Sequence, residues 1–268
     1  MKSFVGLSLS VLLLLIPFGS ASEGSAFEFP KQTQPETPSY FDAYGSVNTH
    51  FGLKTSTQTF MQPSKAALSN LFKSYALTMR DLGITTWLTQ GTLLSWHWNK
   101  HVFPWETDID MHMPLPDLSL LARYYNMTVY PFRFPDTPDG QINEYLLDIN
   151  PHFQKRIVNR QDKNRVDARW VDMSSGTYID ITALHLFDAK ARERGKPILW
   201  QTKDGHVYSD ADVYPLRRTV FEGVEAFVPA EAEKISAKQY GDDALTNNLF
   251  HGYKFDEHER QWIAIQPI

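Results

Sequence analysis

The stretch GTLLSWHWNKHVFPWETDIDMHMP, Gly91–Pro114, contains the pattern that decides the fold. Its second half, Asp108–Met113, alternates polar and apolar residues, which predicts a half-buried strand. The polar positions carry two carboxylates, Asp108 and Asp110, and Glu106 continues the same register. Alternate side chains of a strand point the same way, with their Cα atoms about 6.6–6.8 Å apart. Two ionised carboxylates at about 6 Å repel by roughly 2–3 kcal/mol, so this arrangement requires a physical reason.

A divalent cation supplies such a reason. An ion between Asp108 and Asp110 reverses the repulsion, and carboxylate oxygens are the hard ligands that Mg²⁺ or Mn²⁺ prefers. The alternative is a solvated strand face whose acids only keep the protein soluble. The Asp-x-Asp triplet alone does not separate the two, so the interpretation depends on the surrounding sequence.

Gly91 and Thr92 follow a predicted buried strand, Ile84–Gln90, and open a predicted short helix, Leu93–Asn99. In this arrangement backbone N–H groups and a hydroxyl can hold phosphate oxygens. A simple strand-to-helix turn is the alternative. A third acid, Asp180, lies between two isoleucines in YIDIT and therefore points away from their face; an edge-strand charge is its alternative reading. The Gly-Thr turn, the paired acids and the later single acid together form the pattern of the nucleotidyltransferase superfamily.

The chain of 268 residues suffices for one large domain, or two small ones, with a hydrophobic core. Its composition, 42% hydrophobic and 21% charged, is that of a globular protein. The formal charge of −5 and the scattered Lys and Arg exclude binding by broad phosphate neutralisation, so we expect no nucleic-acid partner. Without cysteine there is no disulfide framework and no cysteine-ligated zinc.

The N-terminus has the pattern of a targeting segment. Lys2 precedes the apolar run Phe4–Phe18, and small residues follow it, which predicts a signal peptide over residues 1–22. The run is short for a membrane span, which needs about 20 residues; a retained signal anchor is the alternative, and only then do we expect membrane association. The sequon at Asn126 predicts N-glycosylation. The expected location is therefore the secretory pathway (ER or Golgi lumen) or the cell exterior.

Residues 23–60 are rich in Ser, Thr, Gln and Pro, which predicts a flexible stem over Glu23–Ser39 and an extended lead-in over Tyr40–Phe60. The lead-in is expected to pack on the following domain through its aromatic residues Tyr40, Phe41, Tyr44 and Phe51. Residues 61–268 are expected to form one domain. It begins with a helix over Ser64–Leu82, which Ser64 caps and Gly83 ends.

Strands and helices interleave along this domain. Further helices are expected over residues 118–125 and 230–240. Strands are expected over residues 144–149, 169–172 and 176–184, and a hairpin-like strand over 221–229. The fold class predicted by this order is α/β (α+β), with a mixed sheet flanked by helices.

The stretch QGTLLSWHWNKHVFPWETDIDM resembles the signature of the LicD and fukutin family, a Gly-Thr-Leu-Leu helix followed by Pro-Trp-acid-x-Asp-hydrophobic-Asp. Further motifs resemble the fungal branch of this family, which is associated with mannosyl-phosphorylation of glycans. These are LLDINPH (146–152), NRVDARWVDMSSGTYIDIT (164–182), and YPLRRTVFEGVEAFVP followed by YGDD (214–243). The resemblance runs from about Tyr40 to Phe255, nearly the whole chain that follows the leader.

The resemblance implies a nucleotidyltransferase-like core. It also implies a metal-dependent phosphotransferase that moves a phospho-sugar or phospho-alcohol from a nucleotide diphosphate donor to a glycan hydroxyl. Mannose 1-phosphate from GDP-mannose is the first expectation; phosphocholine or ribitol phosphate from a CDP donor is the alternative. In this view Gly91 and Thr92 hold donor phosphates, while Asp108, Asp110 and Asp180 bind the metal and carry the catalysis.

The sequence departs from the commoner family pattern at three positions: Glu106 for aspartate, Ser95 for glycine and Gln90 for histidine. Glutamate can still ligate metal, so Glu106 is retained as a further ligand, although its longer arm shifts the geometry. Lys100 is a candidate to neutralise a phosphate, with a surface lysine as the alternative. Arg169 is a candidate to grip the donor, with a structural ion pair as an equal alternative.

His97 and His101 have the spacing of zinc ligands on a helix, but no glutamate follows His97, so packed histidines are expected instead. His112 shares the face of the acids and is a candidate to orient one of them. The tryptophans are expected to build the core, although one of them can stack on a base or sugar. They are Trp87, Trp96, Trp98 and Trp105.

Two rival functions remain at this stage. The first is a non-catalytic accessory protein that binds a glycan or nucleotide sugar and regulates a transferase, which Glu106 slightly favours. The second is a glycosidase, whose paired carboxylates lie about 5–9.5 Å apart across a cleft. A glycosidase leaves the Gly91-Thr92 turn unexplained, and it would work in the presence of a chelator.

Overall fold

The computed structural model of the protein describes residues 31–32, 39, 41, 63–135, 141–156 and 164–265. The first helix, α1 (Lys65–Asp81), confirms the sequence prediction: the Ser64 hydroxyl accepts the Ala67 N–H at 3.1 Å. Gly83 follows with φ +68, a left-handed conformation that glycine adopts without steric cost and that ends the helix.

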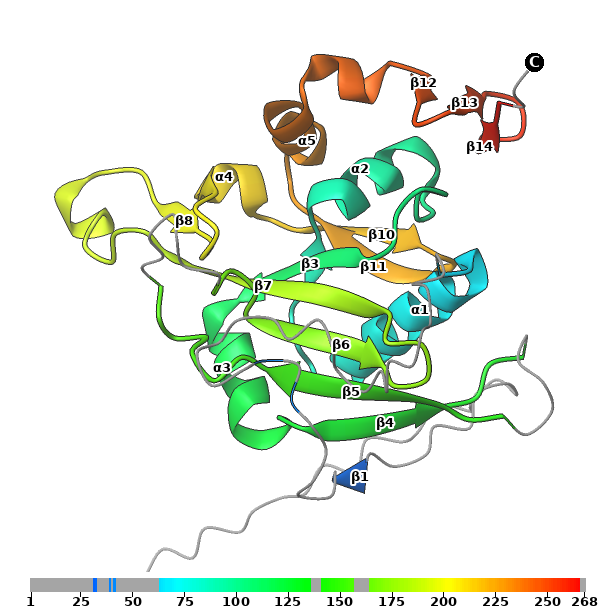
Figure 1. Cartoon of the computed structure of the whole chain (residues 1–268). Coiled ribbons are helices and arrows are strands. Elements are labelled where there is room, and N and C mark those ends of the chain that lie inside the picture. Colours follow the sequence, from blue (N-terminus) through cyan, green and yellow to red (C-terminus); the bar gives the residue numbers. More distant parts are fainter. Residues whose placement is uncertain are drawn as a thin grey trace, which may run out of the picture.

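A mixed sheet forms the centre of the described part of the chain (Figure 1). Its strand order is β1-β4-β5-β6-β7-β3-β2, and β8 and β9 extend from β7. The neighbours β3 and β7 run parallel, and the other pairs are antiparallel. The strands are β1 (Lys31–Gln32), β2 (Trp87–Leu88), β3 (Ile109–Pro114), β4 (Thr128–Phe132), β5 (Asn143–Ile149), β6 (Ala168–Asp172), β7 (Tyr178–Leu186), β8 (Leu199–Gln201) and β9 (Val207–Ser209).

The remaining elements surround this sheet and extend the domain at one end (Figure 1). The helices are α2 (Gln90–Asn99), α3 (Leu115–Tyr124), α4 (Asp210–Val213) and α5 (Ala232–Tyr240), with short 3₁₀ turns η1 (Arg192–Arg194) and η2 (Asp242–Leu245). Two small sheets complete the list, the hairpin β10 (Arg217–Phe221)–β11 (Val224–Val228) and the meander β12 (Leu249–Phe250), β13 (Tyr253–Asp256) and β14 (Gln261–Ala264). The predicted mixed α/β fold with flanking helices is confirmed.

The two faces of the central sheet differ in character. One face carries the main core, where Ile109, Met111, Ile179 and Trp170 pack against α1 and α3. Successive residues of a strand point to opposite faces, so their polar neighbours lie on the other side. On that side, a row of residues that face one another on β5, β6, β7 and β3 is charged, although these residues are largely buried. The packing of the apolar face thus fixes the position of the strands, and with them the row of polar side chains on the other face.

The hairpin β10–β11 follows from its two-residue turn. Glu222 and Gly223 both have positive φ, 48° and 80°, as a type I′ turn requires. The register of the hairpin pairs Phe221 with Val224, directly beside the turn. The predicted hairpin-like strand is therefore two strands, and its first strand begins at Arg217, earlier than the sequence indicated.

The N-terminal predictions fall mostly outside the described residues, including the signal peptide over residues 1–22 and the aromatic residues Tyr40, Tyr44 and Phe51. Phe41 is described and is 5% exposed; it packs with Val129, Leu146 and Val171. Lys31–Gln32, predicted as flexible stem, instead pairs with β4. Within the described ranges, no helix combines the length and apolar character that crossing a membrane requires.

Candidate functional site

The acids predicted from the sequence meet on the polar face of the sheet. Asp110 of β3 and Asp180 of β7 are direct partners in the parallel register, so their side chains share one face. Neighbouring strands lie about 4.8 Å apart, which brings these carboxylates together although 70 positions separate them. Asp108 directly precedes β3 and is half-buried. Asp180 therefore lies on the near side of the sheet, where the metal hypothesis requires it.

The start of α2 abuts this pair of strands. The Thr92 hydroxyl oxygen accepts the backbone N–H of Asp110 at 2.8 Å, and Thr92 is 5% exposed. A methyl group on Gly91 would lie 3.2 Å from Glu106 Oε1, so the absence of a side chain lets the Glu106 carboxylate rest against the helix start. Gly91, Thr92, Glu106 and Asp110 are thus brought together. The hydroxyl of Thr92 is bound to the strand rather than aimed freely at a ligand.

The electrostatics of the cluster are those of acids without enough compensating charge. Burial raises the pKa of Asp110 well above its usual range, and neighbouring carboxylates raise it further, those of Asp108, Asp180, Glu106 and Asp204. Burial likewise raises the pKa of Glu106, with Asp108 adding to the effect. Each such shift means that the charged form is disfavoured at its site. A cation bound among these groups would relieve that cost.

Arg169 of β6 is the cation next to the cluster. Its Nε lies 2.5 Å from Asp180 Oδ1 and its Nη2 3.2 Å from Oδ2, and its guanidinium stacks 3.6 Å from the centre of the Tyr178 ring. Burial raises the pKa of Asp180, while Arg169 lowers it and thereby limits the shift. Four charged residues, one from each of β5, β6, β7 and β3, are register partners and form one charged row across the sheet. In strand order they are Asp148, Arg169, Asp180 and Asp110, so Arg169 lies between two acids and a third acid follows. The structural ion pair expected as one alternative for Arg169 is present.

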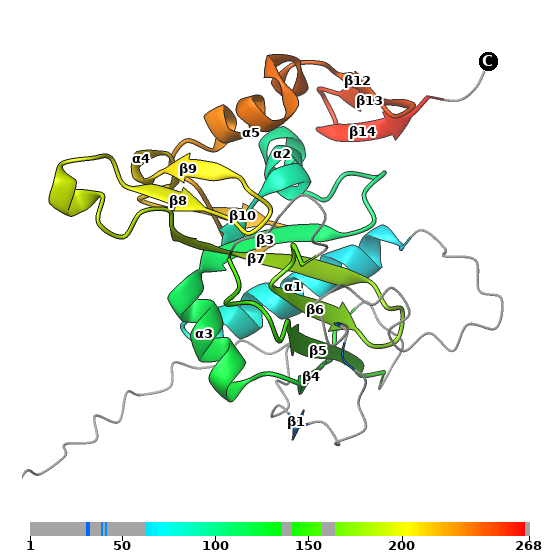
Figure 2. The same cartoon turned by 60° about the vertical axis from the view of Figure 1, so that its left-hand side comes forward.

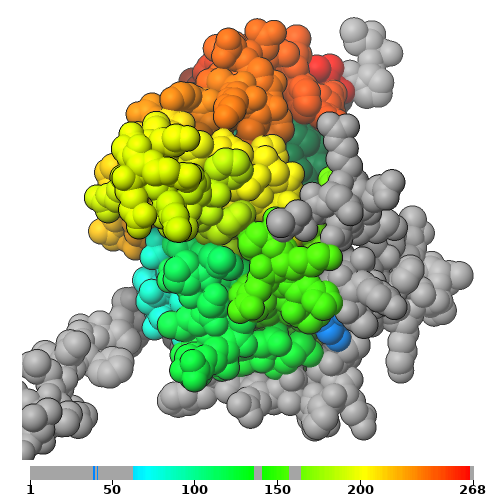
Figure 3. Space-filling model, turned by 90° about the vertical axis from the view of Figure 1, so that its left-hand side faces the viewer, coloured from blue at the N-terminus to red at the C-terminus, as the bar shows by residue number. Residues whose placement is uncertain are grey.

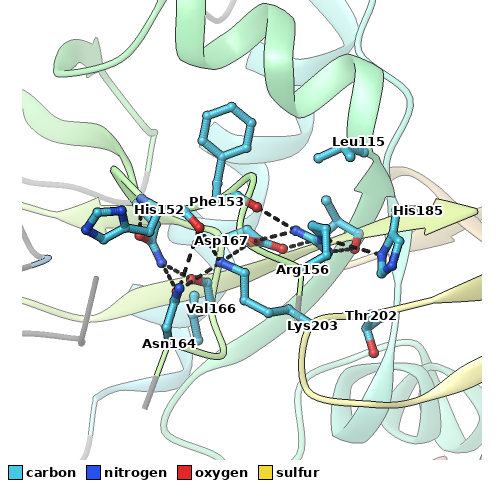
Figure 4. A network of polar contacts seen from close by, with 12 residues as sticks. Leu115, His152, Phe153, Arg156, Asn164, Val166, Asp167, His185, Thr202 and Lys203 are labelled. Carbon is cyan, nitrogen blue, oxygen red and sulfur yellow. Dashed lines mark hydrogen bonds and ion pairs between the residues drawn. The ribbon is translucent and has the colours of Figure 1, made fainter. Parts of the chain in front are cut away.

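A second buried network lies one step along the same face (Figure 4). Asp167, which has no exposed side-chain surface, contacts Lys203 Nζ at 2.7 Å and Arg156 Nη1 at 3.0 Å, and it accepts the Ala183 N–H at 2.8 Å. Lys203 is equally buried and belongs to the turn between β8 and β9. The next residue is Asp204, so this network fixes the turn that supplies the Asp204 charge near Asp110.

The β8–β9 hairpin lies between the C-terminal part and the central strands in the space-filling view (Figure 3). His112 of β3 packs beneath it against Tyr208, with ring centres 5.7 Å apart, and its Nε2 has no hydrogen-bond partner among the described residues. Burial lowers the pKa of His112 to about 3, so the ring is neutral. Within the described ranges His112 has no hydrogen bond to an acid, so its expected orienting role gains no support.

Two other candidates lie away from the acids. Lys100 follows the last residue of α2, at the opposite end from Gly91, and nine residues of helix span about 13 Å. This separation gives its predicted role in phosphate binding no support. His101 forms an ion pair with Glu222 at 3.3 Å, and His97 Nε2 lies 3.4 Å from the Leu245 carbonyl oxygen. His97 is half-buried, as expected, whereas His101 is exposed and held by its ion pair.

Asn126 of the sequon is exposed, and its Oδ1 accepts the Ile149 N–H at 2.9 Å. This hydrogen bond engages the amide oxygen and not the amide nitrogen, which is the atom that carries a glycan. N-glycosylation stays a prediction.

Sequence reasoning missed two residues of the site. Tyr240 at the end of α5 has its hydroxyl beside the start of α2, 3.9 Å from the position of a methyl group on Gly91. Burial raises the pKa of its phenol, and Asp110 and Glu106 add to the effect. The YGDD motif pointed to Tyr240 without giving it a role. Asp204, in the turn KDG, had no signal beyond its turn residues, because its approach to Asp110 depends on the fold.

The donor chemistry of the cluster fits Mg²⁺ or Mn²⁺: several carboxylate oxygens share a partly buried face and raise one another's pKa. The side chains are not, however, arranged as a complete set of metal ligands. Among the residues that the structure describes, no three His, Asp or Glu side chains are gathered closely enough to hold a metal ion. The Asp180 carboxylate is turned toward Arg169 and would share its oxygens between the arginine and an ion.

A mixed sheet with carboxylates on adjacent parallel strands, beside a Gly-Thr helix start, defines a nucleotidyltransferase-type domain. Residues 83–231, more than half of the chain, match the model described as LicD/FKTN/FKRP, nucleotidyltransferase domain, and the chain belongs to this family.

Two curated relatives come from Saccharomyces cerevisiae. Mannosyltransferase regulator 4 is 35% identical over 132 residues, which are 49% of this chain and 11% of the relative. Mannosyltransferase regulator 14 is 29% identical over 148 residues, 55% of this chain and 15% of the relative. The chain thus matches only a small part of the length of these relatives.

Proposed function

We propose that the protein is a metal-dependent phosphotransferase that transfers a phospho-sugar from a nucleotide diphosphate donor to a glycan hydroxyl. The diphosphate bond of the donor breaks, and the nucleoside monophosphate leaves. The observation that carries the proposal is the register of Asp110 and Asp180 on parallel strands, directly beside the start of α2. The family supports the reaction class, since its domain is a nucleotidyltransferase domain. Mannosyl-phosphorylation of glycans is supported by the family resemblance and by the mannosyltransferase regulators among the relatives.

Each residue then has a physical role. Asp110, Asp180 and Asp108 would hold Mg²⁺ or Mn²⁺, with Glu106 as a further carboxylate. When bound, such an ion would supply positive charge to neutralise the donor diphosphate and would help to orient in-line attack. Arg169 and the first N–H groups of α2 supply positive charge and hydrogen-bond donors to the phosphate oxygens. GDP-mannose remains the first donor to test, and a CDP-linked phospho-alcohol the second.

The proton of the acceptor hydroxyl needs a base. Glu106 is suited to this role because its pKa is raised by burial and by Asp108, so the carboxylate is more basic than an exposed glutamate. It also lies against Gly91, at the border between the helix start and the acids. The expected location, the secretory pathway, agrees with a glycan acceptor and follows from the predicted leader and the Asn126 sequon.

The test measures donor binding and turnover together. The purified protein is heated with GDP-mannose or a CDP-linked donor, each with and without Mn²⁺, and transfer to an oligosaccharide is followed by mass spectrometry. We expect stabilisation by one donor only in the presence of metal, and loss of transfer on addition of chelator. Asp110→Asn should reduce the rate of transfer by about 10³-fold or more while the protein stays folded.

The matched control is Glu193→Gln, an exposed acid of η1 outside the cluster, which should keep full activity. Transfer that continues in chelator, or that survives Asp110→Asn, would refute the metal mechanism.

A non-catalytic regulator is the second candidate. It is favoured by the names of the two relatives and by the engagement of Asp180 with Arg169. A regulator would bind the donor or the glycan without turning it over. The unchanged protein on its own would then show binding but no transfer, with or without metal, which separates this candidate from the enzyme.

A further inference from the structure

A cavity of about 490 Å³ opens directly beside the acid cluster, in the range typical of small-molecule sites. Its walls come from α2, the segment before β3, α5 with η2, and the meander β12–β14. These C-terminal elements lie over α2 in both views (Figures 1 and 2). Gly91 and Glu106 belong to the lining of the cavity and to the acid site alike. The two spaces therefore share a border.

Aromatic rings make up most of the wall. Trp105 is the centre of the group: its ring centre lies 5.5 Å from that of Phe250 and 5.0 Å from that of Trp262, and it stacks on His251 at 5.8 Å. These contacts hold Trp105 in one orientation. Phe250 and Tyr240 also line the cavity, yet 52% and 46% of their surface is exposed. Their rings are thus available to a ligand.

The charges on the wall restrict the ligand. The polar groups include the two acids Glu106 and Asp243 together with Asn247 and His251, and no Lys or Arg lines this cavity. A phosphate or another anion would be repelled. A neutral ligand with many hydroxyl groups can donate hydrogen bonds to the carboxylates, and an apolar ring face can lie on Phe250 or Tyr240. Pyranose sugars combine both properties.

We propose that this cavity binds a hexose residue of the glycan acceptor. The inference rests on the proposed transfer to a glycan, and it deepens it by separating two subsites. The acid cluster takes the charged donor, and the aromatic cavity takes the neutral sugar. Glu106 stands at the border, where a hydroxyl of the bound hexose would face the donor phosphate.

The test measures sugar binding alone, without donor or metal, so that it does not depend on turnover. Mannotriose is titrated into the full chain, and binding is followed by tryptophan fluorescence and by saturation-transfer NMR. We expect saturable binding with quenching or enhancement of tryptophan emission. Phe250→Ala should weaken binding about tenfold, because a stacking surface is lost. Asp243→Asn should weaken it by a smaller factor.

Matched controls lie next to both positions. Leu249 is 50% exposed and Asp242 is exposed, and neither lines the cavity, so Leu249→Ala and Asp242→Asn should bind mannotriose as the unchanged protein does. Asp110→Asn should lose the donor but keep the sugar. This last variant distinguishes failure of the proposed reaction from failure of the sugar site.

Two results would overturn the inference. The first is mannotriose binding that is equal in Phe250→Ala and Leu249→Ala. The second is a cavity that takes the nucleoside instead, shown when Phe250→Ala weakens binding of GDP or CDP and leaves mannotriose binding intact. Circular dichroism of each variant confirms that the fold is retained.

Discussion

At the scale of single residues, the site depends on one hydroxyl as much as on the acids. Thr92 bonds the backbone of Asp110 from the start of α2, so it sets how the helix meets β3. The carboxylates around Asp110 repel one another, and without this hydrogen bond the repulsion would tend to move β3 away from the start of α2. The hydroxyl of Thr92 therefore stabilises an arrangement that the charges oppose.

Thr92→Val tests this link, because valine keeps the shape and removes the acceptor. The partly buried N–H of Asp110 loses its partner, which should destabilise the protein by about 1–3 kcal/mol in urea denaturation. Hydrogen exchange at the Asp110 amide should become faster. In Thr92→Ser the hydroxyl remains, so the amide should stay protected even though the lost methyl group costs about 1 kcal/mol. Equal protection in both variants would contradict the role given to Thr92.

Sequence reasoning identified Asp108, Asp110 and Asp180 because their spacing and their neighbours were informative. It could not find Asp204 or place Lys100. Asp204 lies in a turn that is tied to the sheet by the ion pair between Lys203 and Asp167. Lys100 is close to Thr92 along the chain, but the intervening helix carries it away. Local patterns report the direction of a side chain and not its distance from a partner on another element.

At the scale of elements, the end of α2 is joined to the β10–β11 hairpin. Glu222, in the hairpin turn, accepts the Val102 N–H at 2.7 Å and pairs with His101. Burial acts to raise the pKa of Glu222, but hydrogen bonds from His101 and Val102 outweigh it, so the pKa is lowered. The hydrogen bond to Glu222 raises the pKa of His101. One carboxylate thus fastens the hairpin to the chain that leads into β3.

This pair predicts a pH dependence of stability. Because the pKa of Glu222 is depressed, its contribution is complete above 4.5, the ordinary value for glutamate, and is lost as the pH falls through the lower folded value. The pKa of His101 is raised, so its contribution is complete below 6.5 and is lost as the pH rises through the higher folded value. The pair therefore stabilises most between those two values.

Since the His101 side chain is 59% exposed, the gain should be below about 1 kcal/mol. Thermal unfolding measured from below the lowered pKa of Glu222 to above the raised pKa of His101 should show a shallower pH profile in Glu222→Gln than in the unchanged protein. Glu259→Gln, which removes the partner of the exposed His258, should leave the profile as it was. A profile that Glu222→Gln does not alter would count against the pair.

Most elements could be predicted from periodicity and caps: α1, β5, β6, β7 and α5 all lie within a few residues of their expected bounds. The prediction missed β4, because Pro131 lies inside it and proline disfavours a central strand. The register explains why proline is tolerated here. The described β1 pairs only with Thr128 and Val129, so Pro131 has a strand neighbour on one side, β5, and needs no N–H for a second neighbour. Strands of three residues, such as β8, have too few positions for a periodic signal.

At the scale of the whole molecule, the segment before residue 61 is part of the folded unit where the structure describes it. The Ser39 hydroxyl donates to both carboxylate oxygens of Asp148, at 3.1 and 2.9 Å, and Phe41 is buried beside Val129. Asp148 belongs to the same charged row as Asp110. The lead-in thus extends the packed unit through Phe41, one of the aromatic residues through which it was expected to pack on the domain.

Phe41→Ala tests this extension. Removing a buried phenylalanine should cost about 3 kcal/mol in chemical denaturation, through lost burial and the space left behind. Phe187→Ala is the matched control: this ring is 54% exposed, and its loss should cost less than about 0.5 kcal/mol. Equal costs for the two variants would show that the lead-in contributes nothing to the fold.

The parallel pairing of β3 with β7 has a consequence for how the protein comes into being. The segments that must meet are separated by α3 and three intervening strands, so ribosomal synthesis delivers the first aspartate long before its counterpart. Contacts of such long sequence separation form late, after the local helices and hairpins. A newly made chain therefore has no competent centre until its last central strand has docked. Under the proposed function, an unfinished molecule would neither bind the cation nor consume the donor.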